Sequence, residues 1–352
     1  DSPRPASQRA AAFALTAAML ITLAAPAFAK TWHIEDGDIT VKAGETGNDV
    51  TQNNVTTKND TNTIITNRED KASSNTVTID ANGKNDKVEV TLKDVNIDTS
   101  SRNKAAVSVT GEGDTNIKLN GDNALKSDIY RSGIYGSGSL TISGGENDSL
   151  TAQGGSGANG ISSSGSLTIS GGTVTANGDD GGRGISSSGS VTISGGSTVT
   201  ANGGNGTISG GDGICSNGGV TISGGSTVTA NGGNGGSLVG GDGIRSGGGL
   251  TVSDGTVTAK GGNGDSKDGY GGDGIRSGGG VTISGNTVNA AGGNGGKVGG
   301  YGICSFDRVA ISGGAVTANG GDGGSGGGSG IYSSDIDLSG SLELTAKAGS
   351  PN

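Results

Sequence analysis

The chain has 352 residues, of which 77 are glycine and 4 are proline, and aromatic residues make up only 3%. Its formal net charge is −10, and it has no basic cluster for a phosphate backbone to contact, so we expect no nucleic-acid partner. Glycine this frequent without a Gly-X-Y period excludes collagen and leaves either a disordered linker or a repeat fold with glycine turns. Because apolar and polar residues alternate in every repeat, we favour the repeat fold.

The first 29 residues have the pattern of a secretory signal peptide. Two arginines precede an apolar run over residues 10–25, and Pro26 and an Ala-Phe-Ala sequence at 27–29 form a cleavage site before Lys30. A membrane anchor is the alternative, but the proline and the small residues at the cleavage site argue against it. Nothing after Lys30 is apolar for long enough to span a bilayer. We therefore expect a secreted or cell-surface bacterial protein, not inserted in a membrane after signal removal.

The next hundred residues are less regular but still predict β-structure. Residues 30–74 are expected to form a β-rich start or cap, and residues 75–132 wider N-terminal coils. The supporting evidence is a set of short runs in which apolar and polar residues alternate: Asn75–Asp80, Val88–Asp98, Ala105–Val109 and Thr115–Gly121. Val107 lies 27 residues before Ile134, which is the length of one later repeat.

Residues 133–352 contain a regular glycine-rich repeat marked by Gly-Ile. The eight copies begin 24 to 31 residues apart, at Gly133, Gly160, Gly184, Gly213, Gly243, Gly274, Gly302 and Gly330. Each copy has three short strand signals, written GI-x-S, VTIS and TVTA. A period of this length predicts a solenoid in which each unit buries its apolar side chains only against its neighbours.

Alternation within a strand predicts which side chains point inward. In the copy that starts at Gly213, the inward positions are Ile214, Val220, Ile222, Val228 and Ala230, and the outward positions are Cys215, Thr221, Ser223, Thr227 and Thr229. The S-G-G and N-G-G sequences between strands predict turns in which glycine supplies a positive φ.

Length varies at one corner of the repeat. The segment between TVTA and the next Gly-Ile is Asn177–Arg183 in one copy and Lys260–Asp273 in another. Variation confined to one turn predicts loops that project from one edge of the solenoid, where a ligand would bind. The alternative is that these loops are disordered spacers without a partner.

Several of these runs together resemble a known family. The sequence VTLKDVNID, AAVSV and TNIKLNG, followed by repeated GI-x-S-x-G-x-LTISGG-TVTA over about residues 75–346, resembles the secreted carbohydrate-binding β-helix proteins of Firmicutes. The resemblance implies a fold similar to that of polysaccharide lyases, binding of plant polysaccharides such as pectic acid or cellulose, and bound calcium. We accordingly expect an all-β, single-stranded right-handed parallel β-helix with three short strands per coil and glycine-rich variable loops on one edge.

The outward column that follows Gly-Ile provides the first candidate site. It reads Tyr135, Ser162, Ser186, Cys215, Arg245, Arg276, Cys304 and Tyr332. Two adjacent guanidinium groups suit the carboxylates of an acidic sugar, although ion pairs with Asp242 and Asp273 are the favoured alternative. The candidate carbohydrate-binding residues are Tyr135, Arg245, Arg276, Tyr270, Tyr301 and Tyr332.

Asp212, Asp242 and Asp273 form a second column, directly before Gly-Ile. Stacked carboxylates with loop carbonyls suit calcium, which takes six to eight oxygen ligands, but we favour a role in capping turns. Cys215 and Cys304 are three coils apart, about 14 Å by the strand spacing, too far for a disulfide. Both are therefore predicted to be free outward thiols, pointing to an anaerobic habitat or to an incidental occurrence.

Threonine ladders are the most regular outward feature, at Thr173/Thr175, Thr198/Thr200, Thr227/Thr229 and Thr256/Thr258. Hydroxyl arrays can match ice, but exposed strands favour threonine anyway. The single histidine, His33, offers little for catalysis, so we expect no enzyme. The prediction is a monomeric, non-catalytic carbohydrate-binding protein. The alternatives are a structural or adhesive stalk without a small ligand, a polysaccharide lyase, or an ice-binding protein.

Overall fold

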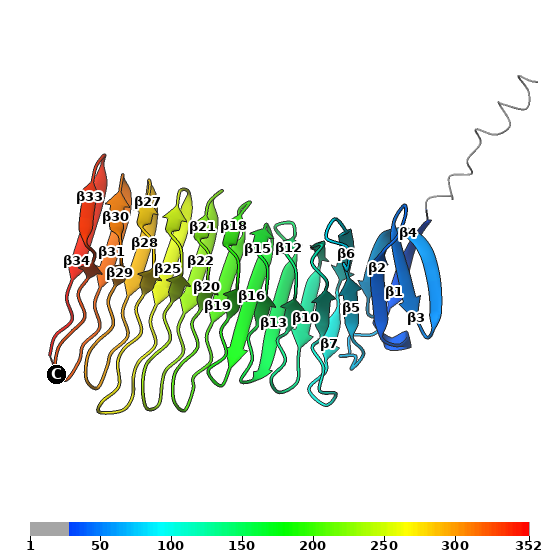
Figure 1. Cartoon of the computed structure of the whole chain (residues 1–352), viewed down its shortest axis with the longest axis horizontal. Coiled ribbons are helices and arrows are strands. Elements are labelled where there is room, and N and C mark those ends of the chain that lie inside the picture. The colour runs from blue at the N-terminus through cyan, green and yellow to red at the C-terminus, as the bar shows by residue number, and fades with distance from the viewer. Residues whose placement is uncertain (1–27, 352) are drawn as a thin grey trace, which may run out of the picture.

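The computed structural model describes residues 28–351, and within them the protein is a parallel β-solenoid (Figure 1). Three strands recur in the same order in each of ten coils, which confirms the predicted solenoid with three strands per coil. Most of the expected signal peptide, residues 1–27, lies outside the described residues and stays a prediction. No helix in the described part of the chain is long and apolar enough to cross a membrane.

The first face of the solenoid is made of the strands that contain Gly-Ile. Each pairs in parallel with the equivalent strand of the next coil, and Val107 of β8 lies beside Ile134 of β11, as the 27-residue spacing predicted. The strands of this face are β5 (Val77–Asp80), β8 (Val107–Thr110), β11 (Ile134–Gly136), β14 (Ile161–Ser163), β17 (Ile185–Ser187), β20 (Ile214–Ser216), β23 (Ile244–Ser246), β26 (Ile275–Ser277), β29 (Ile303–Ser305) and β32 (Ile331–Tyr332).

The second face contains the LTIS or VTIS strands, and the third face contains the TVTA strands. The second face comprises β6 (Lys87–Lys93), β9 (Asp114–Asn120), β12 (Leu140–Ser143), β15 (Leu167–Ser170), β18 (Val191–Ser194), β21 (Val220–Ile222), β24 (Leu250–Val252), β27 (Val281–Ile283), β30 (Arg308–Ile311) and β33 (Asp335–Leu338). The third face comprises β7 (Asn96–Asp98), β10 (Asp122–Lys126), β13 (Ser149–Ser156), β16 (Thr173–Asp179), β19 (Thr198–Asn202), β22 (Ser226–Asn231), β25 (Gly255–Lys260), β28 (Asn286–Ala291), β31 (Gly314–Asn319) and β34 (Leu342–Lys347).

The N-terminal end has a different topology. The strands β2 (Ile39–Ala43), β3 (Asn48–Gln52) and β4 (Val55–Thr66) form antiparallel pairs, and β1 (Phe28–His33) lies parallel to β4. A short 3₁₀ helix, η1 (Ile34–Asp36), connects β1 to β2. The solenoid continues from this end because β2 pairs with β5 and β4 pairs with β6.

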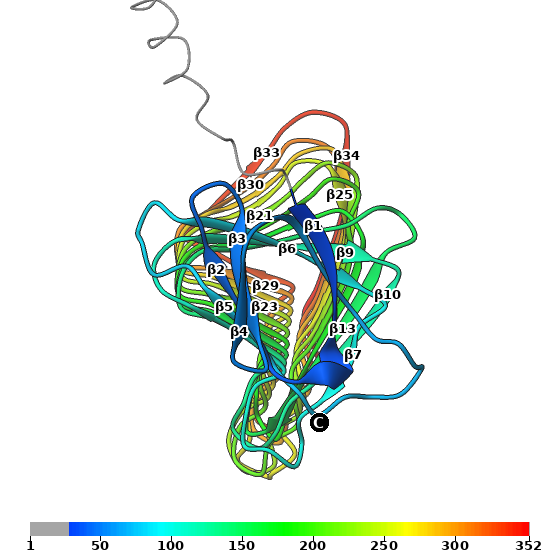
Figure 2. The same ribbon diagram turned by 90° about the vertical axis from the view of Figure 1, so that its right-hand side faces the viewer.

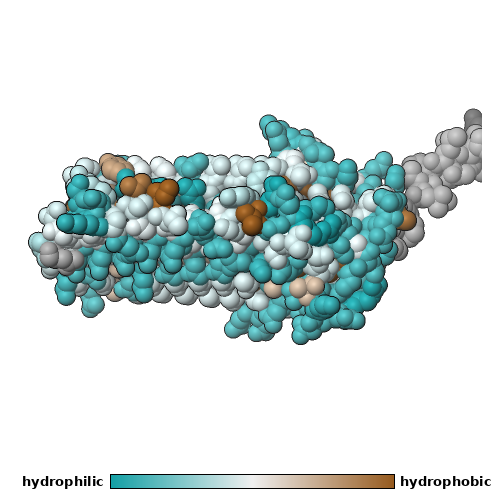
Figure 3. Space-filling model, turned by 90° about the horizontal axis from the view of Figure 1, so that it is seen from below, coloured by the Kyte–Doolittle hydropathy of each residue, from teal (hydrophilic) through white to brown (hydrophobic). Residues whose placement is uncertain are grey.

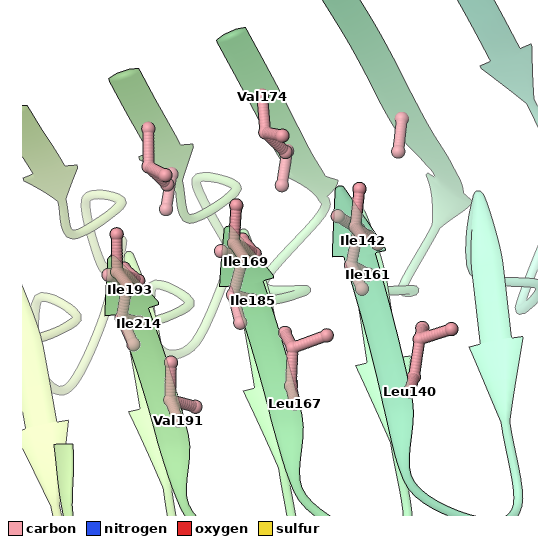
Figure 4. Packing of buried hydrophobic residues seen from close by; sticks show 14 of the residues in the cluster. Leu140, Ile142, Ile161, Leu167, Ile169, Val174, Ile185, Val191, Ile193 and Ile214 are labelled. Carbon is pink, nitrogen blue, oxygen red and sulfur yellow. The ribbon is translucent and has the colours of Figure 1, made fainter. Parts of the chain in front are cut away.

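The core consists of straight columns of apolar side chains along the solenoid axis. Figure 4 shows Leu140, Leu167 and Val191 in one such column. The five inward positions predicted for the copy from Gly213 are all fully buried or within 1% of it, so the prediction from alternation is confirmed. Because every coil supplies the same positions, each layer is covered by the layers on both sides.

Inward serines on the first face extend the core with a polar column. Each buried hydroxyl donates to a glycine carbonyl oxygen of the preceding coil, for example Ser216 to Gly189 at 2.8 Å and Ser277 to Gly248 at 2.9 Å. A buried hydroxyl without a partner would destabilise the fold. The repeated serine therefore satisfies both itself and a carbonyl at the corner between the first two faces.

The glycines of the repeat have two different roles. In the S-G-G turns, Gly195 and Gly196 have φ of +68° and +70°, so the prediction of positive φ is confirmed there. In the N-G-G segments it is wrong, since Gly203 and Gly204 have no φ in the left-handed region. There, close backbone packing requires glycine, because a Cβ on Gly203 would lie 1.9 Å from the carbonyl oxygen of Gly211.

The variable loops stack into a layer that projects from one edge of the solenoid, at the bottom of Figure 1 and Figure 2 and on the side that faces the viewer in Figure 3. We call this the loop layer, and its main members are residues 203–212, 232–242, 261–273, 292–301 and 320–329. Backbone hydrogen bonds cross each loop and also join neighbouring loops: Gly211 donates to Gly204 at 2.9 Å, and Gly233 donates to Gly211 at 2.8 Å. This regular bonding confirms the projecting edge and shows that the loops are ordered, contrary to the alternative of disordered spacers.

Candidate functional site

A groove of about 730 Å³ runs along the corner between the loop layer and the first face. Its floor includes the outward side chains of Arg245 and Arg276, and its wall is formed by the returning halves of the loops, for example residues 239–242 and 270–273. Since both are repeated coil by coil, the groove lies parallel to the solenoid axis. The sequence predicted a binding edge at the variable loops. In the structure, the groove lies on the side of the loop layer that faces the Gly-Ile strands.

Two arginines on adjacent coils lie side by side in this groove, as predicted. Arg245 pairs with Arg276 in the strand register. Arg245 Nε lies 3.1 Å from Asp242 Oδ2, and Arg276 Nη1 lies 3.3 Å from Asp273 Oδ2. The ion pairs that the sequence favoured are therefore confirmed. The arginine side chains remain partly exposed while both aspartates are buried, so the groove presents the guanidinium groups to solvent.

A third arginine belongs to the groove and was missed from the sequence. Arg183 lies 3.3 Å from Asp212, which also has Arg245 at 3.7 Å. Arg183 occupies the column directly before Gly-Ile that Asp212 and Asp242 share in later coils. Alignment of the residues that precede each Gly-Ile would have placed Arg183 one coil away from the carboxylate of Asp212.

The aspartates also connect the wall of the groove from coil to coil. The Oδ1 of Asp212 accepts a hydrogen bond from the backbone N–H of Asp242 at 2.9 Å, and that of Asp242 accepts one from Asp273 at 2.8 Å. Asp273 Oδ1 accepts one from Tyr301 at 2.8 Å. These bonds link neighbouring coils and do not cap a local turn, so the expected turn-capping role stays a prediction. The bonds explain why carboxylates occur at buried positions.

The same contacts bear on calcium. Each of the three carboxylates has one oxygen bonded to a backbone N–H and the other directed at an arginine. A calcium ion needs several uncommitted oxygens. Within residues 28–351 no group of three or more His, Cys, Asp or Glu side chains is arranged to hold a metal ion. These residues therefore do not fit calcium.

Burial, together with the charges of Asp212 and Asp273, raises the pKa of Asp242 to about 7 from an ordinary value of 3.8. The folded protein then keeps a proton that the unfolded chain has lost, so the free energy of unfolding should fall as the pH rises from about 4 to about 7. The variant Asp242→Asn keeps the carbonyl oxygen that accepts the N–H of Asp273, and this part of the pH dependence should disappear. Thermal unfolding between pH 4 and pH 8 measures it.

A matched control is Asp265→Asn, which removes an exposed carboxylate of the same loop layer. This variant should follow the wild-type dependence on pH. Equal slopes for wild type and Asp242→Asn would show that the buried carboxyl of Asp242 does not titrate in this range.

The two cysteines are free, outward and buried. Both are free, which confirms that the spacing forbids a disulfide. They lie at outward positions of their strands, as predicted, but they are not accessible to solvent, since Cys215 is only 4% exposed and Cys304 only 1%. In the strand register Cys215 lies beside Arg245 and Cys304 beside Arg276, so the longer neighbours cover the short thiols. Burial, followed by the charge of a nearby aspartate, raises the pKa of each thiol to about 11.

Aromatic side chains lie at one end of the groove. Tyr270 and Tyr301 line it, and Tyr332 stacks on Tyr301 with ring centroids 5.0 Å apart. Phe306, which the sequence did not single out, lies 5.1 Å from the guanidinium of Arg276. Lys297 lies 5.3 Å from the ring of Tyr270. Exposed rings held in this way offer flat surfaces for the C–H faces of a sugar.

Tyr135 is the exception among the predicted binding residues. It belongs to the same outward column, but it lines a second hollow closer to the N-terminus. The other five candidate residues, Arg245, Arg276, Tyr270, Tyr301 and Tyr332, are brought together at the groove. The sequence thus identified the outward column correctly, but it did not show that the column lines two separate cavities.

The threonine ladders lie on the third face, away from the groove. Thr198 pairs with Thr227 and Thr227 with Thr256, while Thr200 pairs with Thr229 in the same register. The array is thus continuous over these coils, as predicted. It is interrupted at Asn289 and Ala315, so the face does not present one uniform hydroxyl lattice.

Comparison with known proteins found no match to any family model, any curated protein or any solved structure. The resemblance to carbohydrate-binding β-helix proteins therefore stays a prediction. The assignment of function depends on the chemistry of the groove.

Proposed function

We propose that this protein binds an extended polysaccharide chain, without cleaving it, along the groove between the loop layer and the first face. The observation that supports the proposal most is the repetition of binding groups at the coil spacing, with partly exposed arginines on neighbouring coils and tyrosines at one end. Strands of neighbouring coils lie about 4.8 Å apart, comparable with one sugar unit of an extended chain. A repeating surface of this kind suits a repeating ligand.

The arginines have hydrogen-bonding capacity left for such a ligand. A guanidinium carries five N–H donors, and the ion pair of Arg276 with Asp273 is made through Nη1. Arg276 lines the groove and is partly exposed, so its remaining donors are available to sugar hydroxyls or carboxylates. The buried aspartates fix the direction of the side chains, which reduces the entropy lost on binding.

The test is retention of the protein on polygalacturonate and on cellulose. Wild-type protein should be retained on at least one polymer, and the double variant Arg245→Ala, Arg276→Ala should bind at least about tenfold more weakly because charge-assisted hydrogen bonds are lost. A matched control is Arg308→Ala, since Arg308 is similarly exposed and paired with carboxylates, but lies on the second face in β30. Thermal unfolding checks that each variant folds.

Three results would count against the proposal. Absence of retention on any polymer favours the structural or adhesive stalk. Formation of an unsaturated, ultraviolet-absorbing product from polygalacturonate would show a lyase. Unchanged retention of the double variant would remove the groove from the binding site. Apart from these three results, retention that EDTA abolishes would contradict the finding that the aspartates do not fit calcium.

A further inference from the structure

A second hollow, of about 570 Å³, lies on the same face closer to the N-terminus. Its floor contains the outward side chains of four consecutive first-face strands, Thr78, Ser108, Tyr135 and Ser162. Its wall contains residues 103–105 and 130–132, which return from the projecting edge to the first face. The second hollow is thus built in the same way as the groove, from an earlier part of the same two columns.

The two cavities meet at the coil of β14. Ser162 lines the second hollow, and Asn159, three residues earlier in the same coil, lines the groove. The wall is continuous across this point, because the backbone N–H of Gly133, which follows Ser132 of the second hollow, donates to the carbonyl oxygen of Asn159 at 3.3 Å. Together the cavities extend from β5 to β29, which at the coil spacing is about 40 Å.

Tyr130 and Tyr135 give the second hollow two aromatic surfaces, 79% and 42% exposed. Tyr130 has a φ of +58°, a conformation that costs a non-glycine residue about 1 kcal/mol or more. The turn is held by hydrogen bonds from the N–H of Tyr130 to Ser156 and of Arg131 to Asp128, both 2.9 Å. Strained backbone positions are concentrated at ligand-binding sites, so the exposed ring of Tyr130 is a candidate for ligand contact.

The charge of the second hollow differs from that of the groove. Each groove arginine has a buried aspartate beside it, whereas Arg131 has no carboxylate within ion-pair distance in the part of the chain that the structure describes. Its Nε donates instead to Asn103 Oδ1 at 3.4 Å. An unpaired guanidinium on a chain of net charge −10 favours an anionic group on the ligand.

We propose that the groove and the second hollow form one track for a long acidic polysaccharide, and that Arg131, Tyr130 and Tyr135 hold an anionic sugar at its N-terminal end. This inference rests on the proposed function of the groove. The carboxylate of a uronic acid accepts two parallel hydrogen bonds from a guanidinium, and the tyrosine rings stack against the sugar. A neutral chain would gain the stacking but not the charged contact.

The test compares galacturonate oligosaccharides of about five and about ten units, since one unit spans about one coil. In calorimetry, wild-type protein should bind the longer chain at least about tenfold more tightly. Arg131→Gln and Tyr130→Gly should abolish this gain and leave the short chain unaffected. Glycine accepts the φ of residue 130 without strain, so loss of binding in Tyr130→Gly reports the ring and not a folding defect. Arg308→Gln is the control.

The outcomes separate the two proposals. If wild-type protein binds no galacturonate or cellulose oligosaccharide of either length, the proposed function fails and the track with it. If it binds both lengths equally, or if Arg131→Gln and Tyr130→Gly keep the gain, the groove stands and the track is refuted. An equal gain with length for cellulose oligosaccharides would refute the acidic class of ligand.

Discussion

Replacing Gly241 with alanine should lower the free energy of unfolding by at least about 2 kcal/mol, the cost of forcing atoms into a packed interior. A Cβ at this position would lie 1.9 Å from the carbonyl oxygen of Gly211 in the preceding coil. That oxygen cannot move independently, because Gly211 belongs to the backbone hydrogen bonds between neighbouring loops. Denaturant-induced unfolding, followed by circular dichroism, measures the loss.

Gly326→Ala provides the matched control. Gly326 also lies in the loop layer, but a Cβ there would meet no atom within 4 Å, and its φ is not in the left-handed region. Its equivalents in earlier coils are Val298, Tyr270 and Val239, so this column accepts side chains. The control should change stability by no more than about 0.5 kcal/mol. Equal losses in the two variants would mean that glycine is needed for some other reason than close packing.

Ile244→Ala should destabilise the protein by about 2–5 kcal/mol, the range for removing a large buried aliphatic side chain. Ile244 is fully buried in the core column of the first face, with Ile214 on one side and Ile275 on the other. A cavity at this position cannot collapse easily, since both neighbouring layers are fixed by their own strand pairs. The same denaturant-induced unfolding measures the effect.

The equivalent residue of the last coil is the control for Ile244. Ile331 occupies the same position in β32, but it is only partly buried and pairs with a single strand, β29. Ile331→Ala should therefore cost less than half as much as Ile244→Ala. If the two substitutions cost the same, the contribution of a coil would not depend on having neighbours on both sides, contrary to the solenoid argument.

The buried isoleucines of the first face and the glycines of the loop layer together shape the groove. The core columns fix the first face as its floor, and the loop glycines let the returning chain pack closely enough to form its wall. A bulkier loop residue would disturb the contacts between backbones that hold neighbouring loops together. The binding surface is therefore a consequence of the packing rules that stabilise the fold.

Much of this arrangement could be read from the order of the residues. The repeat length predicted the eight regular coils from Gly133 onward, whereas the coils before them were expected to be wider. The alternation of apolar and polar side chains predicted the inward positions of the copy from Gly213, and the repeat predicted the pairing of Arg245 with Arg276. They also predicted the aspartates as ion-pair partners of the arginines. Such features depend on positions within one coil and on the repetition of that coil, which are local properties of the chain.

The remaining features depend on contacts between coils and loops that no single repeat contains. Cys215 and Cys304 are outward yet buried, because the side chains beside them on neighbouring coils are long. The glycines after TVTA pack against carbonyl oxygens on the opposite side of their own loop or in the preceding loop. Arg183 and Tyr130 join a surface whose other members lie far along the chain. Alternation tells which way a side chain points, but its exposure and its partners follow from what the rest of the molecule places over it.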